Sequence, residues 1–217
     1  MKGQDIGLLL KLTCLQMQEE ASCRQFAKSG WQDWDPEHDS IQDPGLLGVF
    51  HPTNYSGDTV VESYSVRALA HVTGISKSQV SLALQRCINV GLARRDRKLG
   101  VPRTNTKALF EFVVYGLRYV FPARLGTVTR GIATSLSAPV FEGQLMSTGE
   151  FVPVWSDARG KSKGQAVEPL FKTATYAVRR DAELYALLAL VDAIRLGQPR
   201  ERNMAIELLQ HRLDATK

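Results

Sequence analysis

Apolar residues recur at helical spacing in several separate segments of the chain. Between residues 4 and 20 they stand three or four positions apart, which predicts an amphipathic helix with Asp5 as a candidate cap. The same spacing predicts helices over residues 105–121, 176–196 and 200–213. The helix over 105–121 carries apolar residues on two sides, so we expect it to be buried on more than one side. A capping residue before it and a proline after it predict its boundaries, Asn105 and Pro122.

Two long stretches lack this periodicity. Three prolines and several glycines lie within residues 28–60, which predicts a long loop. Trp31 and Trp34, at its start, are expected to anchor it. Residues 123–172 are again interrupted by glycine and proline, and they predict an irregular, extended arm that runs over the surface.

Residues 66–85 fit the pattern of two short helices joined by a tight turn. The small residue Ala70 stands where such helices cross, and four positions later Gly74 supplies the positive φ that the turn requires. Ser76 is placed to cap the second helix, and Val80 to pack it on the first. This combination is typical of a helix-turn-helix, although other tight helical hairpins reproduce parts of it.

The second helix of this pair, from Ser76 to Val90, separates its residues by character. Val80, Ala83, Leu84 and Cys87 are predicted to face inward, with Ile88 beside them. The opposite surface carries amides, hydroxyls and cations but no carboxylate that would repel phosphate, and such groups can read base edges in a major groove. The candidate DNA contacts of this helix are Ser76, Lys77, Ser78, Gln79, Ser81, Gln85 and Arg86.

A basic segment follows this helix directly. Gly91 ends the helix, a short strand begins, and Gly100 and Pro102 mark a turn, which predicts a small β-hairpin wing. Cations on a wing contact phosphates, which strengthens binding without selecting sequence. An exposed basic loop is the alternative interpretation. The candidate phosphate contacts are Arg94, Arg95, Arg97, Lys98 and Arg103.

The charge of the chain is unevenly distributed around a net value of +5. Residues 64–130 contain 12 basic and 2 acidic residues, whereas residues 1–63 contain 4 basic and 10 acidic residues. A positive block of this size is typical of a surface that binds a polyanion. Cations of the predicted arm are candidates for a minor-groove contact, with a solvated loop as the equal alternative; they are Arg130, Arg159, Lys161 and Lys163.

Residues 64–104 resemble the winged helix of MarR-type bacterial transcriptional regulators. Residues 115–124, 129–131 and 184–193 resemble a poorly characterised bacterial group that is commonly labelled MarR-like. The resemblance implies a winged helix-turn-helix that regulates transcription. The loop between the first two helices is longer than in MarR proteins, and the arm has no counterpart there, so the phenolic ligands of that family are not carried over.

Together these patterns predict a mainly α protein, a winged helix-turn-helix with a small β-hairpin wing plus additional C-terminal helices. We expect a DNA-binding domain over residues 1–122, with the loop inserted at about 28–60. The arm follows over 123–172, and a helical region over 173–217 is a candidate for dimerisation. The expected function is sequence-specific binding of double-stranded DNA by a homodimer, as a repressor or autoregulator.

The alternative is an adaptor or antitoxin that holds a partner protein or toxin. A DNA-processing enzyme with carboxylates in residues 31–43 is more distant, and we expect no enzymatic activity. Gly160-Lys161-Ser162 resembles the end of a phosphate-binding loop, but position 155 is tryptophan where that loop needs glycine. We therefore expect no cofactor.

Composition gives no sign of a membrane or metal protein. No apolar run approaches the roughly 18 residues of a membrane span, and the start does not resemble a signal peptide. Cys14, Cys23 and Cys87 form no Cys-x-x-Cys pair, which favours a reducing cytoplasm and no zinc. The histidines lack metal-ligand spacing, and the acids between residues 33 and 39 are more typical of a solvated surface than of a metal site.

Overall fold

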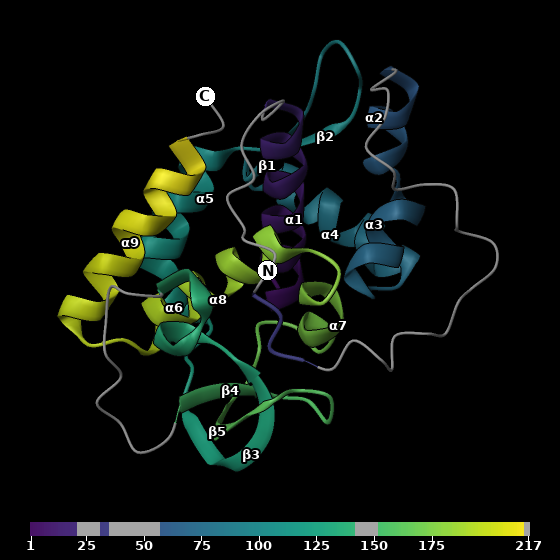
Figure 1. The fold of residues 1–217 in the computed structure, drawn as a ribbon. Coiled ribbons are helices and arrows are strands. Elements are labelled where there is room, and N and C mark those ends of the chain that lie inside the picture. The colour runs from purple at the N-terminus through teal and green to yellow at the C-terminus, as the bar shows by residue number, and fades with distance from the viewer. Residues whose placement is uncertain (21–30, 35–56, 142–151, 215–217) are drawn as a thin grey trace.

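A computed structural model describes residues 1–20, 31–34, 57–141 and 152–214 of the chain. This part is mainly helical, as the sequence predicts, with a two-stranded hairpin and a three-stranded sheet (Figure 1). Its elements in chain order are α1 (Gly3–Glu20), α2 (Gly57–Ser63), α3 (Val66–Thr73), α4 (Lys77–Asn89), β1 (Ala93–Arg95), β2 (Pro102–Thr104), α5 (Thr106–Glu111), the π-helical turn η2 (Phe112–Gly116), α6 (Leu117–Val120), β3 (Leu125–Ala133), the 3-10 turns η3 (Ser135–Ser137) and η4 (Pro139–Phe141), β4 (Val152–Ser156), β5 (Ser162–Val167), α7 (Ala174–Val178), α8 (Ala182–Leu196) and α9 (Pro199–Asp214).

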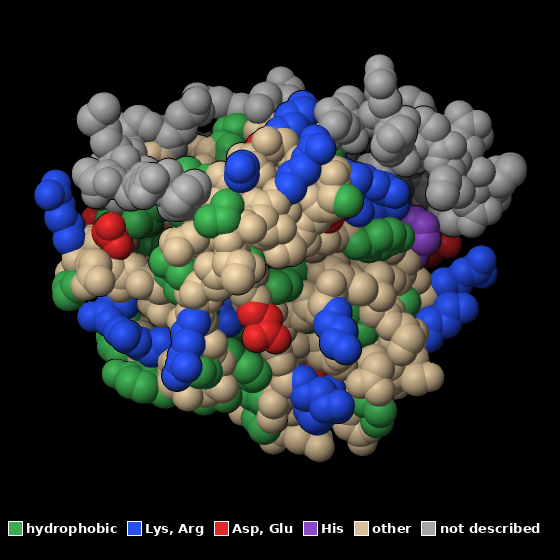
Figure 2. Space-filling model, turned by 90° about the horizontal axis from the view of Figure 1, so that it is seen from below, with side chains coloured by type: hydrophobic (Ala, Val, Ile, Leu, Met, Phe, Trp, Pro, Cys, Tyr) green, Lys and Arg blue, Asp and Glu red, His purple; other side chains and the backbone are tan. Residues whose placement is uncertain are grey.

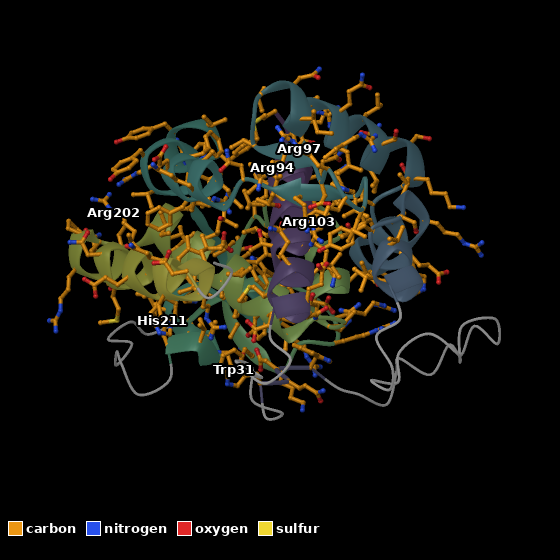
Figure 3. The ribbon with its side chains drawn as sticks, turned by 90° about the horizontal axis from the view of Figure 1, so that it is seen from above. Trp31, Arg94, Arg97, Arg103, Arg202 and His211 are labelled. Carbon is orange, nitrogen blue, oxygen red and sulfur yellow. The ribbon has the colours of Figure 1, made fainter. Side chains whose placement is uncertain are left out.

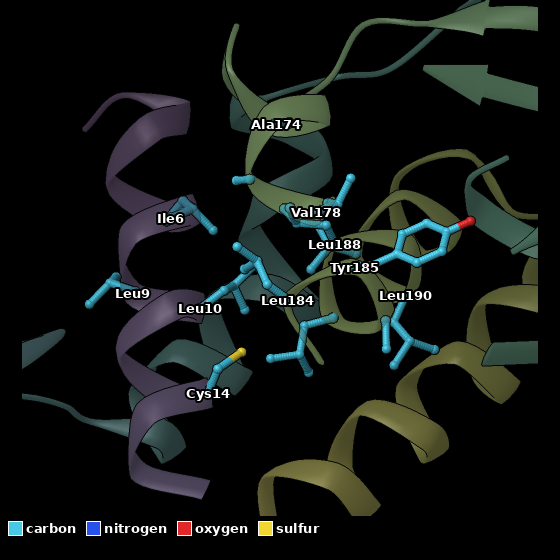
Figure 4. Packing of buried hydrophobic residues seen from close by; sticks show 14 of the residues in the cluster. Ile6, Leu9, Leu10, Cys14, Ala174, Val178, Leu184, Tyr185, Leu188 and Leu190 are labelled. Atoms are coloured by element: carbon cyan, nitrogen blue, oxygen red, sulfur yellow. The ribbon is translucent and has the colours of Figure 1, made fainter. Parts of the chain in front are cut away.

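Helix α8 lies at the centre of the core. Every residue from Leu184 to Arg195 is buried, and α1, α7 and α9 pack around it. Figure 4 shows Leu10 and Cys14 of α1 pointing toward Leu184 of α8. Burial of this continuous apolar cluster supplies the main favourable free energy of folding.

The helix predicted over residues 176–196 is divided into α7 and α8 by a break at Arg179–Asp181. The carboxylate of Asp181 accepts hydrogen bonds from the backbone N–H groups of Glu183 and Leu184, at 3.0 and 3.1 Å, so a new helix starts there. The same carboxylate forms a 2.7 Å ion pair with Lys11 of α1. The apolar spacing over residues 176–196 continues across Asp181 and therefore did not predict this cap.

Residues 106–120 form one helical stretch, as predicted, but with a wide π turn in its middle. The side chain of Asn105 accepts a hydrogen bond from the N–H of Ala108, which confirms the predicted cap. Leu109, Val113 and Leu117 are buried against the core. The stretch is therefore packed against the core through the face that carries these three residues, and its outer face is exposed.

Residues 123–172 differ most from expectation, because their described part contains the strands β3, β4 and β5. Strand β3 pairs antiparallel with β4 and with β5, and β4 pairs parallel with β5, so the three strands close on one another. Figure 1 shows them at the bottom of the molecule, below α6 and α8. The prediction of an irregular, extended arm is therefore wrong.

The physical reason is that glycines which suggested loops lie where two backbones meet. A Cβ added at Gly131 would lie 2.0 Å from the carbonyl oxygen of Trp155, and one at Gly164 would lie 1.8 Å from that of Val152. Glycine inside a strand often marks such an approach rather than a turn. The side chain of Trp155 is itself buried in the common core.

The described part of the predicted loop over 28–60 consists of residues 31–34 and the start of α2; the rest lies outside the described residues. Trp34 forms a β-bridge with Gly160, and both Trp31 and Trp34 are buried, which confirms their predicted anchoring. The Asp33 carboxylate accepts a 2.6 Å hydrogen bond from the N–H of Ala133. Helix α2 begins inside this stretch, where no helix was predicted.

A buried polar cluster joins α8 to the sheet. One carboxylate oxygen of Asp192 accepts hydrogen bonds from the Thr134 hydroxyl at 3.0 Å and the Trp155 indole N–H at 2.6 Å, and the other pairs with Arg195. Burial raises the pKa of Asp192, and the ion pair and hydrogen bonds oppose that shift. Each carboxylate oxygen has partners, so the cluster fixes the sheet on the helix rather than offering a free acid.

Candidate nucleic-acid interface

Helices α3 and α4 are joined by a tight turn of three residues. Gly74 adopts a φ of 68°, and its N–H donates to the carbonyl oxygen of Ala70, which confirms the predicted positive φ. Ile75 is buried in the turn. The hydroxyl of Ser76 accepts a hydrogen bond from the N–H of Gln79 at 3.4 Å, so Ser76 caps α4 as predicted.

The start of α7 supports this turn from a distant part of the sequence. The Thr173 hydroxyl donates to the carbonyl oxygen of Thr73 at 2.8 Å, and the Tyr176 hydroxyl donates to that of His71 at 3.1 Å. Both bonds satisfy carbonyl groups at the C-terminal end of α3, where the helix has ended and supplies no N–H group to bond them. The α3–α4 angle is therefore held by tertiary contacts as well as by the glycine.

Helix α4 buries one face and exposes the other. Of the residues predicted to face inward, Val80, Ala83 and Cys87 are fully buried, and Leu84 is half-buried, as is Ile88 beside them. Burial raises the pKa of the Cys87 thiol to about 12. The opposite surface has neutral polar groups along its middle and a cation at its start, and its exposed members are Lys77, Ser78, Ser81, Leu82, Gln85 and Asn89.

Helix α1 positions α4 through two side-chain contacts. The guanidinium of Arg86 donates two hydrogen bonds, of 2.9 and 2.6 Å, to the fully buried carboxylate of Asp5. This hydrogen bonding raises the pKa of Arg86. The Gln4 amide donates to the Gln79 side chain at 3.0 Å. Two predicted DNA contacts, Gln79 and Arg86, are therefore engaged inside the protein.

Asp5 also helps to begin its own helix. It lies in the first turn of α1, and its carboxylate accepts a 2.8 Å hydrogen bond from the backbone N–H of Lys2, as in a capping box. Asp5 thus stabilises the start of α1 from inside the first turn, and not as the capping residue before the helix that the sequence predicts. No local signal in the sequence pairs residue 5 with residue 86, so the contact to α4 could not be predicted.

The basic segment after α4 is a β-hairpin, as its turn signals predict. Strands β1 and β2 are antiparallel, with Arg94 opposite Arg103. At the tip, the Asp96 carboxylate accepts hydrogen bonds of 2.8 Å from the N–H groups of Leu99 and Lys98, which hold the pKa of Asp96 below its ordinary value. Gly100 completes the tip with a φ of 68°.

Four predicted phosphate contacts of the hairpin are exposed, namely Arg94, Arg95, Arg97 and Lys98. Figure 3 shows Arg94 and Arg97 on the hairpin, and Arg103, the strand partner of Arg94, over α1. The carboxylate of Asp96, the acidic residue of the tip, accepts hydrogen bonds from backbone groups within the turn. The exposed cations therefore dominate the outer surface of the hairpin.

Arg103 is different, because its side chain is held by the protein. Its guanidinium donates to both carboxylate oxygens of Glu19, at 2.8 and 2.7 Å, and to the Tyr64 hydroxyl at 2.7 Å. Burial alone would lower the pKa of Arg103, but the hydrogen bonds to Glu19 and the nearby Tyr64 raise it overall. This residue fixes the hairpin base to α1 and does not face outward with the others.

The four cations predicted for an arm lie instead on and beside the sheet. Arg130 of β3 stands opposite Lys163 of β5, and Lys161 precedes the same strand. Arg130, Lys161 and Lys163 are exposed, whereas Arg159 is half-buried. Figure 2, seen from the side on which the sheet lies, shows more Lys and Arg than Asp and Glu side chains. Arg130 also donates to the carbonyl oxygen of Gly160 at 2.5 Å.

Among the described residues, no three His, Cys, Asp or Glu side chains gather as a metal site would require. Within the same residues, no helix is both long and apolar enough to cross a membrane. A shallow hollow of ≈ 350 Å³ lies beside the start of α4, between Lys2–Gln4, Gly74–Ser76 and Leu170–Thr173.

Comparison with known proteins gave no relative from which to infer a role. No protein-family model matches the chain, and neither a curated protein nor a solved structure is similar to it.

Proposed function

We propose that this protein binds double-stranded DNA through a winged helix-turn-helix formed by α3, α4 and the β1–β2 hairpin. One observation carries the proposal: α4 exposes a face without carboxylates, and a hairpin with four exposed cations follows it directly. A helix of this kind enters the major groove, and the wing contacts the neighbouring backbone.

The proposed reading residues lie on the outward face of α4. Lys77 can donate to guanine, Gln85 can make a bidentate contact to adenine, and the hydroxyls of Ser78 and Ser81 can contact either kind of base. Leu82, exposed on the same face, can contact the methyl group of thymine. Sequence selection would come from these residues.

The proposed phosphate contacts lie on the hairpin, at Arg94, Arg95, Arg97 and Lys98. Gln79, Arg86 and Arg103 are left out of this interface because α1 residues hold them. The role that follows is that of a transcriptional regulator, as a repressor or autoregulator, which agrees with the MarR-like resemblance of residues 64–104.

The first experiment selects a binding site by pull-down of sheared genomic DNA and then measures binding to that site and to random duplex by fluorescence anisotropy. Lys77→Ala and Gln85→Ala should each reduce the preference for the selected site by about 5- to 150-fold, because a bidentate base contact discriminates by roughly 1–3 kcal/mol. Binding to random duplex should change little.

The second experiment addresses the hairpin. Arg94→Ala with Arg97→Ala should weaken binding to all duplexes and reduce the slope of log K against log [salt] by about 0.9 for each phosphate that is no longer neutralised. Arg200→Ala, an exposed cation of α9, is the matched control and should leave the slope unchanged. A wild-type slope in the hairpin variant, or wild-type binding in both α4 variants, would contradict the proposed interface.

A second candidate function is contact with a protein partner on the same face. Exposed apolar residues at Leu82, Val90 and Leu99 favour it, because such residues suit a protein surface better than a phosphate backbone. This candidate predicts that Leu82→Asp abolishes capture of the partner while DNA binding, if any, stays weak and insensitive to the selected sequence.

A further inference from the structure

The outer face of the α5–η2–α6 stretch carries a straight row of exposed side chains. Lys107, Glu111, Tyr115 and Tyr119 stand four residues apart, and all four are exposed; we call them the 107–119 stripe. Tyr115 and Tyr119 are 72% and 78% exposed, which is unusual for two large aromatic side chains on one helix face. In the view from above, side chains of this teal stretch protrude at the upper left edge (Figure 3).

The π turn is what keeps this row straight. In an unbroken α-helix of 3.6 residues per turn, each step of four residues drifts by about 40°, so Tyr119 would lie about 120° round the helix from Lys107. The wider turn at Phe112–Gly116 rotates the chain less per residue and so reduces that drift. On the opposite side, Leu109, Val113 and Leu117 are likewise four residues apart and all buried.

We propose that the 107–119 stripe is the interface with a second copy of this chain, packed antiparallel about a two-fold axis between Glu111 and Tyr115. The inference deepens the proposed function, since a symmetric pair presents two copies of α4 to two DNA half-sites.

The chemistry of the stripe favours its own antiparallel copy as the occupant. Its first half is charged and its second half is aromatic. The two-fold arrangement places Glu111 against Tyr115 of the second copy, where the phenol O–H can donate to the carboxylate. It also places Lys107 over Tyr119 of the second copy, a cation–π pair. A parallel arrangement would oppose Glu111 to Glu111 and Lys107 to Lys107, which is repulsive.

The other helices considered for dimerisation are used inside the protein. Helix α8 is buried along its length, and α1 is buried from Asp5 to Leu15 between α4 and α8. The apolar residues Ala205, Leu209 and Leu213 of α9 are buried in the same core. Among the described helices, the 107–119 stripe carries the aromatic side chains that the core does not bury. Tyr and Trp are among the residues most enriched in binding hot spots.

The test measures the oligomeric state without DNA, by sedimentation over a wide range of protein concentration. The wild type should dimerise reversibly, and Tyr115→Ala and Tyr119→Ala should each raise the dimer dissociation constant about 10- to 30-fold. Val61→Ala, which truncates an exposed apolar residue of α2, is the matched control and should leave it unchanged. A monomeric wild type, or a dimer indifferent to both tyrosine changes, would overturn the proposal.

A crosslinking experiment tests the register. In a Cys23→Ser background, Lys107→Cys and Tyr119→Cys proteins are mixed and treated with a short thiol-specific crosslinker. The mixture should give a covalent dimer, because residues 107 and 119 of different copies face each other. Each variant alone should not, because its own two cysteines would lie about 18 Å apart along the helix axes. Crosslinking in a single variant would refute the register. Neither experiment contains DNA, so a negative result in either one would contradict the dimer proposal without contradicting the DNA-binding proposal.

Discussion

Gly74 allows the conformational and packing roles of a turn glycine to be separated. Gly74 and Gly91 both adopt a left-handed φ, of 68° and 77°. They differ in their surroundings: a Cβ at Gly74 would lie 2.9 Å from Cδ1 of Tyr176 and 3.0 Å from Cβ of Thr173, whereas a Cβ at Gly91 would meet nothing within 4 Å. Gly74→Ala and Gly91→Ala therefore make the same chemical change in the same backbone conformation, but only the first creates a clash.

The expected costs follow from this difference. Left-handed backbone disfavours alanine by about 1–2 kcal/mol, and this is the whole expected loss of unfolding free energy for Gly91→Ala. In Gly74→Ala, Thr173 and Tyr176 must also move, which disturbs their hydrogen bonds to the carbonyl groups of Thr73 and His71. Each bond contributes about 0.5–1.5 kcal/mol, so Gly74→Ala should cost about 2–5 kcal/mol in all.

Urea denaturation followed by far-UV circular dichroism measures both variants against the wild type. Gly74→Ala should be less stable than Gly91→Ala by about 1–3 kcal/mol, with little change in the m-value. Thr173→Val, which removes only the hydroxyl donor, should reproduce part of the extra loss. If the two alanine variants are equally stable within about 0.5 kcal/mol, α7 does not support the turn and the reasoning fails.

Three further outcomes can be measured. Asp192→Ala should lower the free energy of unfolding by about 3–5 kcal/mol, because it leaves a buried guanidinium without its partner; a decrease below about 1 kcal/mol in urea denaturation would argue against the cluster. Cys14 and Cys87 are buried and burial raises both thiol pKa values, so mass spectrometry should find them unmodified by iodoacetamide at about pH 7.5 until the protein unfolds. Burial would raise the pKa of Asp157, but its hydrogen bonds and Arg179 lower that pKa overall. The stability that the ionised Asp157 carboxylate contributes is therefore present above the unfolded pKa of about 3.9 and disappears as pH falls through the lower folded value. Asp157→Asn should accordingly make the free energy of unfolding fall less steeply at acid pH.

Features that depend on local chemistry were predictable from the sequence. The caps at Ser76 and Asn105, the left-handed Gly74 and the inward face of α4 each follow from a few neighbouring residues. The hairpin after α4 follows in the same way from its turn residues. Such signals need no knowledge of the rest of the fold, because the hydrogen bonds that they predict close within about four residues.

Features that depend on distant contacts were not predictable. The strands between residues 123 and 172 contain glycines required by backbone approach, and in a single sequence such glycines are indistinguishable from those of a loop. Asp181 starts a new helix inside an apolar pattern that runs through it. The same limit applies to the candidate site, where Arg86 and Arg103 appear in the sequence as cations like their neighbours.

The α1 carboxylates that bind these two arginines change how the positive charge of the proposed interface is distributed. Asp5 neutralises Arg86 in the last turn of α4, and Glu19 neutralises Arg103 on the second strand of the hairpin. The exposed cations that remain lie at the two ends of the surface, at Lys77 and on the outer hairpin, with uncharged side chains on α4 between them. Phosphate contacts of the hairpin would fix the register of the helix on the duplex, and Lys77 with the neutral groups of α4 would face the base edges. Because Asp5 holds Arg86, that guanidinium is not free to attract the phosphates of every sequence equally. The carboxylates of α1 therefore help to determine the charge of the proposed recognition surface, although no α1 residue would touch DNA.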